Sequence, residues 1–108
     1  MEPLFVYMTA ADTAEAERIG RALVEARLAA CVNVLPGMRS FYWWDGAVRT
    51  GDEAVLVAKT TRSRMDALTT AVQRLHSYEV PCIAALPIVD GNAAFLDWIR
   101  DETSRASE

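Results

Sequence analysis

The chain has 108 residues, of which 52% are apolar, with 15 acidic and 11 basic side chains. This length is typical of one domain, and the apolar fraction suffices for a core without disulfide or metal staples. Both predict a single folded domain over residues 1–108 that needs no cofactor to fold, and they exclude a disordered chain. The net charge of −4 argues against electrostatic binding to nucleic acid or anionic lipid, because both depend on surplus Lys and Arg.

The start of the chain and the cysteine pattern predict a cytoplasmic location. Glu2 stands where a signal peptide needs a basic residue, and the apolar run that follows is short. No stretch approaches the roughly 18 apolar residues of a membrane span. The two cysteines form no C-x-x-C pair, so free thiols in a reducing compartment are expected.

The first half of the chain is predicted to form a strand, a helix and a long hairpin. Residues 4–10 are a β-type apolar run, and helical spacing follows to about residue 26, with Asp12 as N-cap and Glu15 completing a capping box. Strand patterning returns over residues 30–44, turns at Asp45-Gly46 and resumes over residues 53–61.

The second half adds a helix, a strand and a terminal helix. Ser63 is the predicted N-cap of a helix that ends near His76. A strand is predicted over residues 80–89, on a sheet edge because of its prolines, and a short helix after Asn92. The order β-α-β-β-α-β plus a helix predicts an α+β, ferredoxin-like split βαβ fold with both main helices on one face of an antiparallel sheet.

The strand over residues 30–44 is too long for its own domain. At about 3.3 Å per residue it extends about 50 Å, against a radius of gyration of about 13 Å for a domain of this size. Even with a bend at Pro36-Gly37, the aromatic segment 41–44 projects beyond one small core. Exposed aromatics on a sheet edge invite aggregation unless another chain covers them, so a homo-oligomer built through this ribbon is expected.

Several segments together resemble the CutA family of divalent ion tolerance proteins, and the resemblance covers nearly the whole chain. They are LAACVNVLPG at 28–37, SFYWWDG at 40–46, Lys59-Thr60 and HSYEVP at 76–81. The resemblance implies a ferredoxin-like subunit in a homotrimer, with long ribbons pairing between neighbours as in PII signalling proteins. It also implies a role in tolerance of divalent metals, chiefly copper. Departures occur at Ser77, where the family usually has proline, at Met8, where some members have cysteine, and at Leu75, where some have a second histidine.

His76 is the principal candidate metal ligand, because it is the only histidine and imidazole suits borderline-soft metals. Met8 could add a thioether, which Cu(I) accepts. A structural alternative stands beside each: a histidine at a helix end can complement the helix dipole, and a strand methionine is more often core.

Cys31 and Cys82 are possible thiol ligands but not a disulfide within one subunit. In the split βαβ order their strands occupy opposite sheet edges, about 14 Å apart, which exceeds disulfide reach. They could approach each other only across a subunit interface, and free buried thiols are the default expectation.

A cleft between subunits is the second candidate site, and only the resemblance groups its residues. These are Trp43, Lys59, Thr60, Tyr78 and Glu79.

A rival, PII-like hypothesis places a small anionic ligand in that cleft. It rests on the cations around the start of the second helix, although a solvated basic face explains them as well. They are Lys59, Arg62 and Arg64.

Nucleotide, zinc-protease and serine-hydrolase motifs are all absent from the sequence. The leading hypothesis is therefore a cytoplasmic, non-catalytic homotrimer that responds to divalent metals and binds copper or a similar cation. Its protein partner is unknown. An enzyme would need His76, Glu79 and Cys31 to converge in one pocket.

Overall fold

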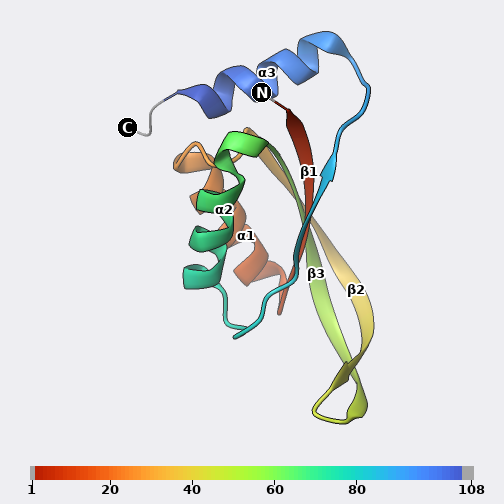
Figure 1. Ribbon diagram of the computed structural model, residues 1–108. Coiled ribbons are helices and arrows are strands. Elements are labelled where there is room, and N and C mark those ends of the chain that lie inside the picture. Colours follow the sequence, from red (N-terminus) through yellow and green to blue (C-terminus); the bar gives the residue numbers. More distant parts are fainter. Residues whose placement is uncertain (1, 106–108) are drawn as a thin grey trace.

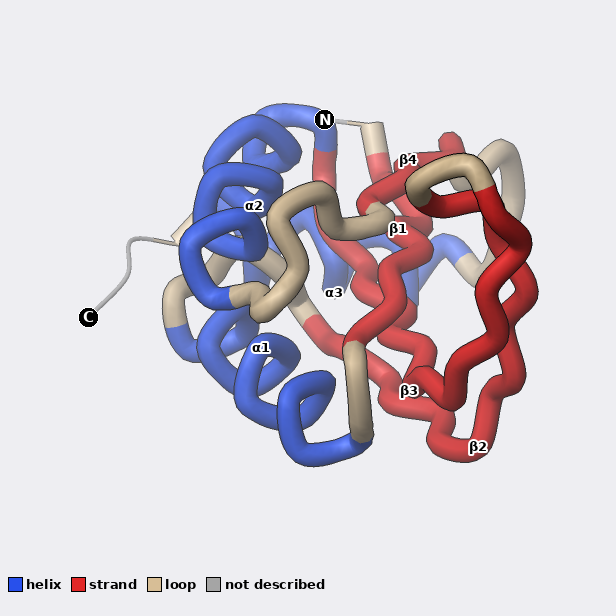
Figure 2. Tube along the Cα trace, turned by 90° about the horizontal axis from the view of Figure 1, so that it is seen from below, coloured by secondary structure: helices blue, strands red, loops and turns tan. Residues whose placement is uncertain are grey.

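The computed structural model describes residues 2–105. Its elements are β1 (Pro3–Ala10), α1 (Thr13–Glu25), β2 (Cys31–Trp44), β3 (Ala47–Thr61), α2 (Arg62–Leu75), β4 (Ile83–Pro87) and α3 (Ala93–Ser104). All strand pairs are antiparallel, in the spatial order β2-β3-β1-β4. The α+β, ferredoxin-like fold is confirmed, with α1 and α2 on one face of the sheet (Figures 1 and 2).

The core lies between the sheet and these two helices. Alternate residues of β1 and β3 point into it, as the two-residue period of a strand requires. The largest members are Leu4, Val6, Met8, Leu56, Ile19, Leu23, Leu68 and Val72, each 1% exposed or less. The opposite face of the sheet carries Phe5 and Leu86, exposed to 38% and 50%, and none of the helices described within residues 2–105 covers it.

The predicted N-cap of α1, Asp12, is confirmed, although Glu15 accepts from the Ala11 N–H and not from that of Asp12; the predicted cap of α2 is wrong. The Asp12 carboxylate accepts the Glu15 N–H at 2.8 Å, which satisfies a free donor of the first turn. The N-cap of α2 is Thr61, which makes no capping hydrogen bond with its side chain, and Ser63 lies inside the first turn. β3 runs directly into α2, so no loop is left in which Ser63 could begin the helix.

The β2–β3 ribbon extends past the rest of the subunit, as expected (Figure 1). The molecule measures 44 × 30 × 22 Å. β3 begins at Ala47 rather than at residue 53, because Asp45 and Gly46, with φ angles of 53° and 77°, form a tight turn that keeps both strands paired to the tip. Phe41 and Trp43 on this ribbon are exposed to 71% and 75%.

A bulge in β2 interrupts the ribbon's register. The pairing Leu35↔Val55 is followed by Met38↔Glu53, so β2 holds one residue more than β3 at this point. Gly37, with a φ of 79°, supplies the left-handed backbone. The predicted irregularity at Pro36-Gly37 is therefore present as a bulge.

β4 is an edge strand, as predicted, but shorter than residues 80–89. It pairs with β1 only from Met8↔Ile83 to Leu4↔Pro87. Pro81 lies outside the strand and Pro87 ends it, because proline has no N–H to donate to a ladder. The residues before it form an irregular loop from His76 to Cys82.

α3 lies across the sheet end where α2 begins (Figure 1). Ile99 and Thr103 are fully buried there. Arg64 donates to the carbonyl oxygens of Thr103 and Arg105, at 2.6 and 3.0 Å, and so satisfies acceptors that the helix end leaves unpaired. No helix within residues 2–105 is long and apolar enough to span a membrane.

Candidate functional site

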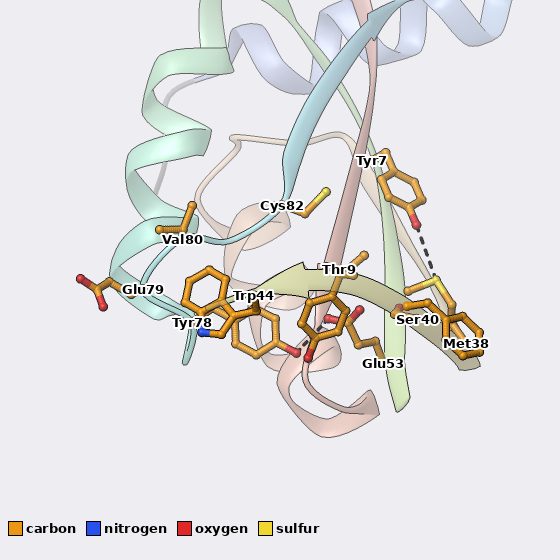
Figure 3. Close-up of a pocket in the computed structure, with 12 residues that line it drawn as sticks. Tyr7, Thr9, Met38, Ser40, Trp44, Glu53, Tyr78, Glu79, Val80 and Cys82 are labelled. Carbon is orange, nitrogen blue, oxygen red and sulfur yellow. Dashed lines mark hydrogen bonds between the residues drawn. The ribbon is translucent and has the colours of Figure 1, made fainter. Parts of the chain in front are cut away.

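A pocket of about 630 Å³ lies where β1, the ribbon and the loop before β4 meet (Figure 3). Its lining comes from β1 (Tyr7, Thr9), from the ribbon (Met38, Ser40, Phe41, Tyr42, Trp44, Glu53) and from the loop (Tyr78, Glu79, Val80, Cys82).

The bulge decides which ribbon residues face this pocket. An unbroken ladder would set Gly37 opposite Glu53, but the extra residue sets Met38 there. A shift by one residue reverses the facing of every side chain beyond it. Tyr42 and Trp44 therefore share the face of Glu53 and line the pocket.

His76 fastens the loop to the β1–α1 turn. Its Nε2 donates to the Thr9 carbonyl at 2.7 Å, and its Nδ1 accepts the Tyr78 N–H at 3.0 Å. This pair of bonds assigns the neutral tautomer with the proton on Nε2. The His76 side chain is 1% exposed.

Glu15 holds the same loop from the helix side. One carboxylate oxygen accepts the Ala11 N–H at 2.9 Å and the other accepts the Ser77 N–H at 2.8 Å. Burial alone would raise the pKa of Glu15, but these hydrogen bonds lower it overall. The loop is therefore anchored at both His76 and Ser77.

Tyr78 connects the anchored loop to the ribbon. Its hydroxyl donates to Oε2 of Glu53 at 2.8 Å, and its ring lies 4.6 Å from that of His76. Burial and the hydrogen bond to the Glu53 carboxylate raise the pKa of Tyr78 well above its ordinary value. Tyr78 consequently stays a neutral donor at physiological pH.

The two cysteines are free; Cys31 begins β2 at one edge of the sheet, and Cys82 lies directly before β4 at the other edge, as the strand order predicts. The expectation that both are buried is wrong: Cys31 is half-buried, and Cys82 is exposed at the pocket. Desolvation and the nearby Glu53 carboxylate raise the pKa of the Cys82 thiol. Cys82 is thus a protonated thiol at neutral pH unless a cation replaces its proton.

The structure does not place Met8 or His76 as open metal ligands. Met8 is 1% exposed inside the core, and both ring nitrogens of His76 are engaged within the chain. Among residues 2–105, no three His, Cys, Asp or Glu side chains gather around a point where they could hold a metal ion. One subunit therefore does not fit a resident metal centre.

The predicted cleft residues are only partly brought together. Tyr78 and Glu79 line the pocket, but Thr60 is fully buried, with its hydroxyl bonded to the Leu28 carbonyl. Lys59 contacts Asn33, and neither Lys59 nor Trp43 lines the pocket.

The main residues that sequence reasoning missed are Glu53, Met38 and Tyr7. The sequence contains a pattern that could have pointed to Glu53, since a charged residue at the start of an apolar strand is unusual. Met38 carries none, because its facing depends on the bulge.

The cations proposed for an anionic ligand are committed to other partners. Arg62 pairs with the Glu2 carboxylate at 2.9 Å, and Arg64 is bound to the end of α3. The pocket itself is lined by two acidic residues and by no Lys or Arg of the described chain; the Glu53 carboxylate lies among the lining side chains, whereas that of Glu79 points outward (Figure 3). This electrostatic environment disfavours an anion.

Comparison with known proteins identifies the family. Residues 4–102 match the sequence pattern of the family described as "CutA1 divalent ion tolerance protein". The chain belongs to the CutA1 family.

Two relatives named divalent-cation tolerance protein CutA match this CutA1 chain over most of both lengths. The one from Archaeoglobus fulgidus is 46% identical, over 92% of this chain and 95% of that protein. The one from Thermus thermophilus is 47% identical, over 91% and 95%. The rice relative, "Protein CutA 1, chloroplastic", is 42% identical over 93% of this chain, which spans 56% of the rice protein's length.

Solved CutA1 structures agree with the fold. CutA1 from Oryza sativa superposes with a TM-score of 0.92 at 40% identity, covering 94% of each chain. The Thermus thermophilus protein gives a TM-score of 0.91 at 45% identity, covering 93% of this chain and 97% of that one. The described fold is therefore the fold of the CutA1 family.

Proposed function

We propose that this protein acts in the cellular response to divalent metal ions as a cytoplasmic, non-catalytic homotrimer that binds copper or a similar cation weakly at the pocket. The observation that carries the proposal is the charge of the pocket, whose lining holds the Glu53 carboxylate and no Lys or Arg of the described chain. Such a site attracts cations, and the net charge of −4 per chain adds to the attraction.

The donor atoms at the pocket support a preference for copper. The Cys82 thiol and the Met38 thioether are soft ligands, and the Glu53 carboxylate adds a hard one. Cys82 binds a metal as thiolate, so its raised pKa makes binding weaker at low pH. Because one subunit brings no complete ligand set together, affinity is modest unless a neighbouring subunit contributes.

Three exposed features support a homotrimer. The ribbon presents Phe41 and Trp43 to solvent, the sheet face opposite the helices is uncovered, and β2 and β4 leave two free sheet edges. If β2 of one chain pairs with β4 of the next, the contact is head to tail. Such contacts close into a ring when the rotation that relates neighbouring chains divides a full turn. A ring of three copies would pair both edges and cover the exposed aromatic residues of the ribbon.

Calorimetric titration of the full protein tests the metal proposal. Zn²⁺ is used beside Cu²⁺ because zinc does not oxidise thiols. We expect Cys82→Ser to weaken binding by about tenfold or more, as loss of a soft ligand should, and Cys31→Ser on the opposite sheet edge to leave it unchanged.

His76→Gln is the decisive companion variant. Gln keeps a side-chain N–H for the Thr9 carbonyl, so if His76 only anchors the loop, this variant binds metal nearly as the unmodified protein does. A loss equal to that of Cys82→Ser would return His76 to the ligand set. Absence of heat with either metal in the unmodified protein would overturn direct binding.

A further inference from the structure

We propose that the same pocket also binds a small organic ammonium ion, which goes beyond the proposed role in metal tolerance. The lining combines aromatic rings from β1, the ribbon and the loop with a carboxylate between them. The rings are those of Tyr7, Phe41, Tyr42, Trp44 and Tyr78. Aromatic faces attract organic cations through the ring quadrupole, most strongly where water is excluded.

Cavity size and donor count favour an organic cation over a bare ion as the better-fitting occupant. The volume of about 630 Å³ lies in the range of small-molecule sites, and it far exceeds the space that a metal ion fills. A metal needs several converging donors, which the described residues do not bring together. An ammonium ion needs only aromatic faces and one opposing carboxylate.

Glu53 is placed to supply that carboxylate. Tyr78 donates to its Oε2, and Oε1 has no hydrogen-bond partner among the described residues. Figure 3 shows Tyr78 reaching Glu53 from the loop and Tyr7 reaching Met38 from β1, so two of the rings are held by hydrogen bonds. The hydrogen bonds of His76 and Glu15 keep the loop, and with it the ring of Tyr78, in this position.

Other occupants fit less well. The Glu53 carboxylate would repel an anion, and a neutral apolar molecule would desolvate that carboxylate without supplying an opposite charge. The two arginines of the ribbon do not line the pocket: Arg39 donates to the Asp52 carboxylate, and Arg49 donates to the Trp44 carbonyl at the hairpin end.

The test compares choline with its uncharged carbon analogue, 3,3-dimethylbutan-1-ol, on the full protein in its native oligomeric state. Binding is followed by calorimetry and tryptophan fluorescence at constant ionic strength. We expect saturable binding of choline and binding of the alcohol weaker by about tenfold or more. Equal binding of both would show that charge is irrelevant, and no saturation by choline in the millimolar range would also overturn the inference.

Two variants locate the site. Glu53→Gln keeps an acceptor for the Tyr78 hydroxyl but removes the charge, and we expect it to weaken choline binding by about tenfold. Trp44→Leu should do the same, whereas Trp98→Leu, on α3 and away from the pocket lining, should not. Undiminished binding by both pocket variants would overturn the assignment.

Failure of this inference is distinguishable from failure of the metal proposal. Heat with Cu²⁺ or Zn²⁺ but none with choline overturns the ammonium site alone. Choline binding without any metal heat supports the ammonium site and overturns direct metal binding.

Discussion

At the scale of single residues, the side chains with the most unusual surroundings serve the structure of the site. The side chains of His76 and Glu15 are almost fully buried, and their polar atoms form hydrogen bonds with backbone groups of neighbouring segments. A buried carboxylate or imidazole is tolerated only when its hydrogen bonds are satisfied. The chain therefore uses its only histidine to hold Tyr78 in the pocket wall.

Replacing Glu15 by Gln should destabilise the protein in a pH-dependent way. A Gln side chain offers one acceptor, so either the Ala11 or the Ser77 N–H loses its partner, at a cost of about 1–3 kcal/mol. The folded-state pKa of Glu15 lies below its ordinary value of 4.5, so its stabilisation is complete above pH 4.5 and is lost as the pH falls through the folded-state pKa.

Urea unfolding at fixed protein concentration measures both effects. The difference in unfolding free energy between the unmodified protein and Glu15→Gln should be full at pH 7 and shrink below pH 4.5. The exposed Glu17→Gln, on the same helix, is the matched control and should change little. A difference that does not depend on pH would contradict the role assigned to the carboxylate.

At the scale of elements, the bulge in β2 is the decisive local feature. One extra residue places Met38, Tyr42 and Trp44 on the pocket face. The bulge needs a left-handed backbone at Gly37, whose φ of 79° is strained for any residue with a Cβ.

Gly37→Ala should therefore destabilise the protein by about 1–2 kcal/mol. The space around Gly37 is open, so backbone strain alone causes the loss. Gly51→Ala in the same ribbon is the control, because its backbone is not left-handed and its nearest neighbour, the Tyr42 hydroxyl, lies at an ordinary contact distance of 3.6 Å. Equal unfolding midpoints for the two variants would show that the bulge is not under strain.

At the scale of the whole molecule, the single chain exposes apolar surface that the proposed homotrimer would bury. Phe41, Trp43 and Trp44 are all more than half exposed, and the sheet face behind them is open. Burial of aromatic surface is the main source of association energy.

The unmodified protein should sediment at three times its chain mass. Trp43→Glu replaces a ring that is 75% exposed in the single chain by a carboxylate, so the fold should stay intact. The charge should oppose burial of this position in an interface and shift the protein toward smaller oligomers. Trp98→Glu on α3, where the ring is 40% exposed, should retain the assembly. Sedimentation velocity with circular dichroism separates dissociation from unfolding, and a monomeric unmodified protein would refute the homotrimer.

The sequence by itself determined the element order, the cap of α1, the hairpin turn and the overlong ribbon. These follow from local periodicity, turn chemistry and simple length, which act over a few residues. The strand order then followed from the ferredoxin-like pattern, and it correctly separated Cys31 from Cys82.

Only the tertiary structure decided the site. Whether Met38 or Gly37 faces Glu53 depends on a bulge, and whether His76 is open or engaged depends on the carbonyl of Thr9, 67 positions away. Thr60 and Lys59, adjacent in sequence, point to opposite faces, so their neighbourhood along the chain said nothing about a shared cleft. Register and burial arise from pairings between distant segments, and one residue of shift reverses them, so local pattern cannot specify them.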